Sequence, residues 1–454
     1  MAFSRLFCDL FRREKLAVLV LLPVFFATAV LLFVGMPILQ DHVAYRYSIG
    51  FADGYDLMAT NLANGKGYRW RPDMAETMIR EPGYPLLLAA AFKIAGYHIE
   101  AARLLNFLLT VGIAVMLMAL ARGLTGDPRV PLIAALLFLV HPGTLIAEAR
   151  GGVEILFIFV GFGFILALRW AVEKGGLWRY LLAGLAFGVV LQVRSTPMMF
   201  PVLLLLYTLF TVTGVHEHLM AAARVATLVV GMGLVMAPWV VRNYWLVHEF
   251  VPLTSLSGVA LQEGLCMCRN VSFGVDLYPV GEAAGRERGE LARELGLRFE
   301  GVEYFQMFYD AHDETAFNRI LNETARKQYA RNPGLLVKCA GNNLFNLWFL
   351  GKTWNITKLN MLVQGPMLAL VFCGLWIVWR QSNLSKMGIV LIYVGSIAMT
   401  HILVVAEARY SIPLFAFLAI PAGVAVTFIW DKVRKPRVGS SSPLPLPYDT
   451  MPIS

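Results

Sequence analysis

The sequence predicts an all-α polytopic membrane protein with about ten transmembrane helices, because apolar runs of roughly 20 residues recur along the chain. The 454 residues are 58% hydrophobic and 15% charged, with a mean hydropathy of +0.63, whereas soluble domains carry about 25% charged residues. The predicted spans lie near residues 16–36, 104–122, 130–147, 153–172, 179–193, 196–214, 224–241, 359–380, 386–404 and 410–430.

Two apolar stretches depart from this pattern. The span at 179–193 is short and ends beside Arg194 and Pro197. The run at 84–97 is shorter than a span and is interrupted by Lys93. A helix of that length and polarity is expected to lie on the membrane surface.

The net charge of +9 is concentrated at the termini and in alternate short loops. This distribution sets membrane orientation and requires no nucleic acid partner. Because an even number of spans places both termini on one side, we predict that both termini are cytoplasmic. The basic residues that carry this bias are Arg5, Arg12, Arg13, Lys15, Arg122, Arg129, Lys174, Arg179, Arg224, Arg380, Lys386, Lys432, Arg434, Lys435 and Arg437.

Two long loops then face outward and divide the chain. The charged stretch GRERGELARELGLRFEGVEYF in the second loop is predicted to be helical, and the Ser- and Pro-rich C-terminus is predicted to be disordered. The expected parts are a transmembrane core at 1–241 that includes the first outer loop (37–103), a large periplasmic loop at 242–358, C-terminal helices at 359–430 and a cytoplasmic tail at 431–454.

Five cysteines are too few for a disulfide-built fold. Cys266, Cys268 and Cys339 all fall in the second outer loop, so that a disulfide to Cys339 and free thiols are both compatible with the sequence. No Cys or His spacing indicates a structural metal.

The first outer loop gathers acids, arginines and aromatic residues at the predicted membrane surface. Asp53 and Asp56 are three residues apart and would share one face of a helix. A carboxylate in such a place can deprotonate a hydroxyl or bind a divalent ion, but Asp is also a common helix N-cap. Further polar candidates of the same loop are Tyr55, Arg80, Glu81 and Tyr84.

A second group of charges follows the third span. Glu148 and Glu154 lie at or just inside the membrane boundary, where a charge costs less than the roughly 2.5–3.5 kcal/mol of a helix centre but usually faces a cavity or a partner. Pairs Glu148–Arg150 and Glu154–Arg194 are the structural alternative to a functional role.

Three arginines and two aromatic side chains complete the candidates. Arg194, Arg242 and Arg409 are predicted to emerge on the same face of the membrane as the acids, and a guanidinium there suits a lipid phosphate. Snorkelling to water is the alternative for Arg194. His401 and Tyr410 accompany Arg409 in the segment THILVVAEARYSIP.

Several of these segments, in this order, resemble the GT-C glycosyltransferases of the protein O-mannosyltransferase and aminoarabinose-transferase type. The matching strings are DGYDLMATNLANGKGY with REPGYPLLLAAAFKIAG, then VEILFIF, APWVVRNYWLVHEFVPLTSLSG and HILVVAEARYSIP. In many relatives the first-loop acid would stand two positions earlier, where this chain has Phe51, and this leaves Asp53 and Asp56 as alternatives. Residues 271–358 match no motif of the family.

The resemblance implies an inverting glycosyltransferase of the bacterial inner membrane that moves a sugar from a polyprenyl-phosphate donor to a glycan, lipid or protein acceptor on the periplasmic face. Asp53 or Asp56 would be the base and Glu154 a second acid. The arginines named above would bind the donor phosphate, and no cofactor is required, although the acids could admit a divalent metal. Residues assigned to the sugar or the acceptor are Tyr55, Arg80, Glu81, Tyr84, Glu148, His401 and Tyr410.

Two rival functions use the same architecture. A transporter or flippase of a lipid-linked saccharide would carry symmetric halves and helices interrupted at the membrane midplane, neither of which is evident in the sequence. A ligase that transfers a whole glycan would differ only in its donor.

Overall fold

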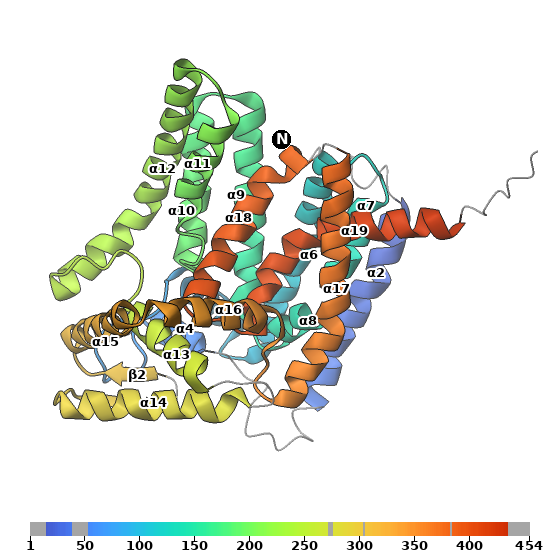
Figure 1. Ribbon diagram of the computed structural model, residues 1–454. Coiled ribbons are helices and arrows are strands. Elements are labelled where there is room, and N and C mark those ends of the chain that lie inside the picture. Colours follow the sequence, from blue (N-terminus) through green and yellow to red (C-terminus); the bar gives the residue numbers. More distant parts are fainter. Residues whose placement is uncertain (1–14, 39–52, 271–275, 303–304, 382–383, 435–454) are drawn as a thin grey trace, which may run out of the picture.

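The computed structural model describes residues 15–38, 53–270, 276–302, 305–381 and 384–434. Helices account for most of this part of the chain (Figure 1). The predicted disordered tail lies outside the described residues from 435 onward, and so does the 39–52 part of the first outer loop.

Within the described residues, seven helical segments are long and apolar enough to cross a membrane. The protein is therefore an all-α polytopic membrane protein, as the sequence predicts. The segments are α2 (Lys15–Val30) with its π-helical continuation η1 (Leu31–Gly35), α6 (Ile99–Leu124), α9 (Val153–Lys174), α12 (Val215–Val247), α17 (Trp354–Arg380), α18 (Leu384–Leu403) and α19 (Ile412–Arg434), which follows the short 3₁₀ helix η2 (Ala408–Ser411).

The remaining predicted spans are also helical, but they are bent or short. The span at 130–147 is two helices, α7 (Val130–Leu139) and α8 (Pro142–Ala149), inclined by 53°. Pro142 begins the second helix, and the His141 ring caps it by accepting a hydrogen bond from the Gly143 N–H at 3.1 Å. Two further helices, α10 (Leu177–Val193) and α11 (Phe200–Thr211), are shorter than a full span.

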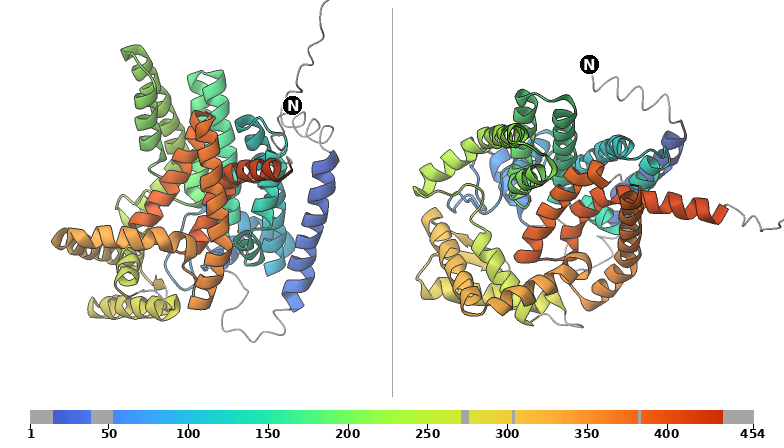
Figure 2. Two further views of the ribbon diagram at one scale, coloured as in Figure 1. Left: turned by 45° about the vertical axis from the view of Figure 1, so that its right-hand side comes forward. Right: turned by 45° about the horizontal axis from the view of Figure 1, so that its top comes forward.

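Helices α9 to α12 form neighbouring antiparallel hairpins (Figures 1 and 2). Helices α10 and α12 approach closely because both present glycine at their contact. A Cβ atom on Gly184 would lie 2.1 Å from the Leu228 carbonyl oxygen, and one on Gly231 would lie 2.4 Å from that of Leu181. Any side chain at these positions would force the two helices apart.

The second outer loop folds into a small domain at one end of the bundle, away from the α9–α10 and α11–α12 connections (Figure 1). We call it the outer-loop domain. The stretch predicted as helix is helical only to Glu294; Gly296, with φ +68°, follows, and a hairpin pairs Phe299 with Phe308. The elements are α13 (Ser257–Asn270), α14 (Leu277–Glu294), β1 (Phe299–Val302), β2 (Phe305–Phe308), α15 (Ala311–Arg331) and α16 (Pro333–Phe349).

Two helices of the first outer loop, α4 (Tyr55–Ala63) and α5 (Gly83–Ala95), pack against each other beside this domain. The buried Glu314 of α15 joins the loop to the domain: it accepts hydrogen bonds from the Thr77 hydroxyl at 2.6 Å, from the Met78 N–H at 2.9 Å and from the Ser255 hydroxyl. These bonds fix the first outer loop at the same end of the bundle as the outer-loop domain.

A disulfide between Cys268 and Cys339 ties α13 to α16, whereas the nearby Cys266 is a free, buried thiol. Of the two alternatives that the sequence leaves open, the structure thus contains the disulfide. The bridge closes a segment of 71 residues that includes most of the outer-loop domain.

Loss of this disulfide is expected to destabilise the outer-loop domain by about 2–5 kcal/mol. Cys268→Ser and Cys339→Ser should therefore lower the melting temperature of the purified protein, and the two variants should lower it equally. A reducing agent should lower the melting temperature of the wild type but not of either variant. Cys373→Ser is the matched control, because Cys373 is a free cysteine of α17. Unequal effects of the two variants would contradict the prediction.

Candidate active site

A cavity of about 1720 Å³ opens where the first outer loop, the bundle and the outer-loop domain meet. Its wall combines charged side chains on one part with apolar side chains on another. The segments that line it are residues 53–57, 80–81, 145–150, 194–199, 252–263, 352–356 and 399–410, together with Leu31, Met36, Trp70, Met307 and Arg326.

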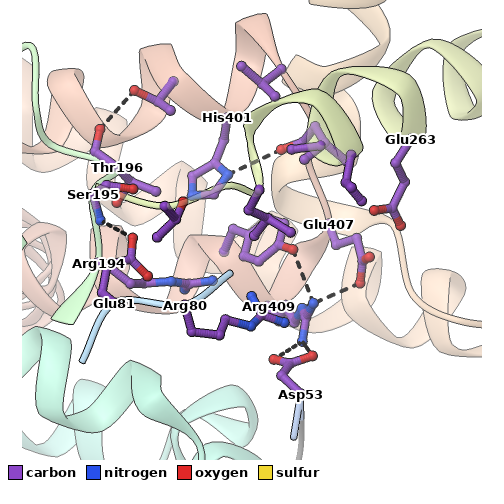
Figure 3. A pocket seen from close by; sticks show the side chains of 18 of the residues that line it. Asp53, Arg80, Glu81, Arg194, Ser195, Thr196, Glu263, His401, Glu407 and Arg409 are labelled. Carbon is purple, nitrogen blue, oxygen red and sulfur yellow. Dashed lines mark hydrogen bonds and ion pairs between the residues drawn. The ribbon is translucent and has the colours of Figure 1, made fainter. Parts of the chain in front are cut away.

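Asp53 and Arg409 form the central ion pair of the cavity (Figure 3). Arg409 donates from Nη1 to Asp53 Oδ2 at 2.9 Å and to Oδ1 at 3.2 Å, and from Nη2 to the Tyr410 hydroxyl at 3.1 Å. Asp53 has a left-handed φ of +64°, and Gly54 follows with +72°. A Cβ on Gly54 would lie 2.2 Å from the Trp70 ring, so this glycine lets the chain turn tightly and present the carboxylate to the arginine.

The pKa of Asp53 lies well below its ordinary value. Burial alone would raise it, but the charges of Arg409, Arg80 and Arg194 and the hydrogen bond from Arg409 outweigh burial. Asp53 is consequently ionised at any pH at which a cell works, and it is a weak proton acceptor in this state.

This shift has a consequence for stability. A group whose pKa is lowered by folding stabilises the fold above its ordinary pKa, here 3.8, and loses that contribution as the pH falls toward the folded value. Asp53→Asn should therefore be less stable than the wild type at pH 7, and the gap should narrow below pH 3.8. Melting temperatures measured from pH 7 to pH 3 test this; a gap that does not change with pH would contradict it.

Among the described residues, five arginines line the cavity, and the charges of three of them act on Asp53: Arg80 from the turn before α5, Arg194 from the end of α10, and Arg409 from η2 (Figure 3). The other two are Arg150 and Arg326. The Arg194 side chain pairs with Glu154 at 3.6 Å and lies over the Tyr410 ring, 5.1 Å from its centroid. Arg80 lies over the Tyr55 ring at 5.2 Å. Three cations thus lie near Asp53 in one cavity, and Arg409 pairs with this carboxylate at 2.9 Å.

Neighbouring groups hold these cations in place. The Glu81 carboxylate accepts a hydrogen bond at 2.8 Å from the Ser195 N–H, next to Arg194. The His401 and Tyr410 rings stack with centroids 4.3 Å apart. Glu407 forms an ion pair with Lys352 at 3.3 Å and another with Arg409 Nε at 3.6 Å.

Other residues predicted for the site lie outside this cavity. Asp56 accepts a hydrogen bond from the Tyr97 hydroxyl at 2.8 Å, and the Tyr84 hydroxyl donates to the Gly151 carbonyl at 2.6 Å. Glu148 is buried in α8 and does not line the cavity. Of the two predicted acids, the structure therefore brings Asp53 rather than Asp56 to the arginines.

Arg242, predicted to bind phosphate, is also outside the cavity. Its guanidinium donates to Glu76 Oε2 at 2.9 Å and to the Thr77 carbonyl at 2.9 Å, and it lies over the Trp239 ring. It therefore joins α12 to the first outer loop. Arg80, which the sequence did not assign to the phosphate, lines the cavity instead.

Sequence reasoning missed three charged residues of the cavity: Glu263 on α13, Arg326 on α15 and Lys352 before α17. All three come from the second outer loop, where no motif of the family is recognisable, and single charges in such a loop have no distinguishing sequence signal. Among the described residues, no group of three or more His, Cys, Asp or Glu side chains could hold a metal ion.

The fold is that of an all-α polytopic membrane protein with a charged cavity where the bundle meets the outer-loop domain. The archaeal oligosaccharyltransferase AglB from Archaeoglobus fulgidus, solved with an inhibitory peptide and a dolichol-phosphate, superposes with a TM-score of 0.52 at 14% identity. The match covers 93% of this chain and 51% of AglB, so the chain spans about half the length of that enzyme.

A family model matches part of the chain by sequence. Residues 80–241 match the family described as dolichyl-phosphate-mannose-protein mannosyltransferase, which confirms the resemblance found in the motifs. ArnT from Cupriavidus metallidurans, solved with undecaprenyl phosphate, is 15% identical over 90% of this chain and 77% of its own, with a TM-score of 0.37. No curated protein matches the chain by sequence.

Proposed function

We propose that this protein is a membrane glycosyltransferase that moves a sugar from a polyprenyl-phosphate donor to an acceptor, with inversion at the anomeric carbon. The observation that carries the proposal is the convergence of Arg80, Arg194 and Arg409 with Asp53 in one cavity. The match of residues 80–241 to a mannosyltransferase family and the GT-C fold support the same reaction class.

The three arginines suit the phosphate of such a donor. A guanidinium binds phosphate oxygens through paired, charge-assisted hydrogen bonds, and it also stabilises the negative charge that gathers on the phosphate as the sugar leaves. Arg194 is preoriented by Glu154, and Arg409 by Asp53 and the Tyr410 hydroxyl. The leaving group would therefore meet cations that need little rearrangement.

An apolar part of the same cavity suits the lipid chain of the donor. Leu31, Leu57 and Ile146 line the cavity and are exposed, from η1, α4 and α8 respectively. A polyprenyl chain lying along these side chains would remain in the bilayer while its phosphate reached the arginines. The bilayer is thus itself a partner of the reaction.

Asp53 is proposed to act through its charge. Its low pKa makes it a poor acceptor for a proton, so the role of base suggested by the family resemblance suits it less than electrostatic stabilisation. As the bond to phosphate breaks, positive charge develops on the sugar ring, and an ionised carboxylate beside the ring would stabilise it. Asp53 would also hold Arg409 toward the phosphate.

We place this cavity on the periplasmic side of a bacterial inner membrane. The support is the positive-inside bias of the short loops, which puts the two long loops outside. Alkaline phosphatase fused after residues 90 and 300 should be active in cells, whereas a fusion in the loop after Lys174 should be inactive.

The reaction is tested with purified full-length protein in phospholipid vesicles, given radiolabelled undecaprenyl-phosphate mannose, glucose or aminoarabinose and an envelope extract from the native host as acceptor. Transfer of label into a new, alkali-stable glycosidic product is the expected result. Binding without any new glycosidic bond would contradict the proposal, and movement of labelled donor across the vesicle membrane would favour a transporter.

A further inference from the structure

Glu263 lines the cavity from the outer-loop domain, not from the bundle. It lies on α13, and its carboxylate points into the cavity beside that of Glu407 (Figure 3). No described residue forms a hydrogen bond or an ion pair with it, in contrast to Asp53, Glu81, Glu154 and Glu407. Its oxygens are therefore available to a ligand.

The position of Glu263 is fixed by the packing of its helix. A Cβ on the adjacent Gly264 would lie 1.9 Å from the Val404 carbonyl oxygen, so α13 lies directly on the segment that leads to Arg409. At the start of the helix, a Cβ on Gly258 would lie 2.3 Å from the Asn318 carbonyl oxygen of α15. At its end, the disulfide from Cys268 anchors it to α16.

The pKa of Glu263 is shifted upward, whereas the pKa of Asp53 is shifted downward. Burial raises the pKa of Glu263, and the nearby Glu407 carboxylate raises it further, while Arg288, Lys352 and Arg409 lower it less. Proton affinity is what a general base needs, and it is best when its pKa approaches the working pH. Of the two acids, Glu263 is the better suited to accept a proton.

We infer that Glu263 binds the attacking hydroxyl of the acceptor and takes its proton, a role that rests on the proposed glycosyl transfer. The acceptor oxygen forms a bond to the anomeric carbon, and the bond from that carbon to the phosphate oxygen breaks. The electron pair leaves with the polyprenyl phosphate, which Arg80, Arg194 and Arg409 retain, and the proton passes to the Glu263 carboxylate. The acceptor thus enters from the outer-loop domain, and the donor enters from the bundle.

The test compares wild type, Glu263→Gln, Glu263→Asp and Glu287→Gln in the vesicle assay described above, with the affinity for undecaprenyl phosphate measured in parallel. Glu287 is the matched control because it is an exposed acid of the neighbouring α14, bonded to Gln262 and outside the cavity. We expect Glu263→Gln to lose about 10²- to 10⁴-fold in transfer with an unchanged affinity for undecaprenyl phosphate. Glu263→Asp should recover part of the loss, and Glu287→Gln should match the wild type.

A pH profile separates a base from a residue that only shapes the cavity. If Glu263 accepts the proton, the fall of kcat/KM at acidic pH reports the protonation of Glu263. Lys352→Gln should shift this fall to higher pH, because Lys352 lowers the pKa of Glu263 and its loss raises it. Transfer by Glu263→Gln within threefold of wild type would overturn the inference and leave the proposed function intact. A joint loss of transfer and of undecaprenyl phosphate affinity would overturn it too. A wild type that transfers none of the sugars would instead overturn the proposed function.

Discussion

Replacing Asp53 by Asn is expected to lower sugar transfer by about 10²- to 10³-fold, the usual cost of removing one preorganised electrostatic group from an active site. The substitution keeps the size of the side chain but removes its charge. Arg409 then loses its two bonds of 2.9 and 3.2 Å to a carboxylate, and the sugar ring loses the nearby anion that would stabilise its developing positive charge. Transfer is measured in vesicles with the labelled donors at saturating concentration.

Asp56→Asn is the control for this experiment. Asp56 belongs to the same loop and lies three positions further on, but its carboxylate bonds the Tyr97 hydroxyl outside the cavity. Its replacement should leave transfer within a few-fold of the wild type. An Asp53→Asn protein with full activity would remove Asp53 from the mechanism, and a greater loss in Asp56→Asn would return the choice between the two acids to Asp56.

The sequence was sufficient to predict the class of fold because hydrocarbon demands long apolar helices, and their lengths can be counted. It could not predict how the helices end. Whether residues 130–147 run straight depends on Pro142 and the cap formed by His141, and the start of α11 at Phe200 follows Pro197 and places Pro201 in its first turn. The outer-loop hairpin after Glu294 was hidden by the charged, helix-favouring residues before it.

For the candidate site, the sequence indicated which types of residue would line it, acids and arginines, but not which individual residues would be in contact. Arg194 and Arg242 look alike in the sequence, since each follows an apolar helix on the same side of the membrane. Their environments differ because Glu76 and the Thr77 carbonyl bind Arg242 outside the cavity, while Arg194 lines the cavity and pairs with Glu154 behind it. The contacts of Arg242 join residues 165 and 166 positions apart, and periodicity and composition carry no information about such contacts.

Arginines that line the cavity are expected to affect donor binding more than arginines outside it. Arg409→Gln should weaken binding of undecaprenyl phosphate by about 10- to 100-fold, because a hydrogen bond to a charged group contributes about 1.5–3 kcal/mol and each 1.4 kcal/mol is tenfold in affinity. We choose Arg409 because its guanidinium contacts three residues that line the cavity, Asp53, Glu407 and Tyr410. Affinity is measured by titrating the purified protein with undecaprenyl phosphate in detergent.

Arg242→Gln is the matched comparison, with the same chemical change outside the cavity. It should retain the affinity for undecaprenyl phosphate but lower the melting temperature, because the Glu76 carboxylate and the Thr77 carbonyl lose their partner. Arg409→Gln with unchanged affinity would show that the donor phosphate binds elsewhere. If Arg242→Gln instead lost the affinity, the phosphate would bind where α12 meets the first outer loop, and the cavity would have to hold only the sugar and the acceptor.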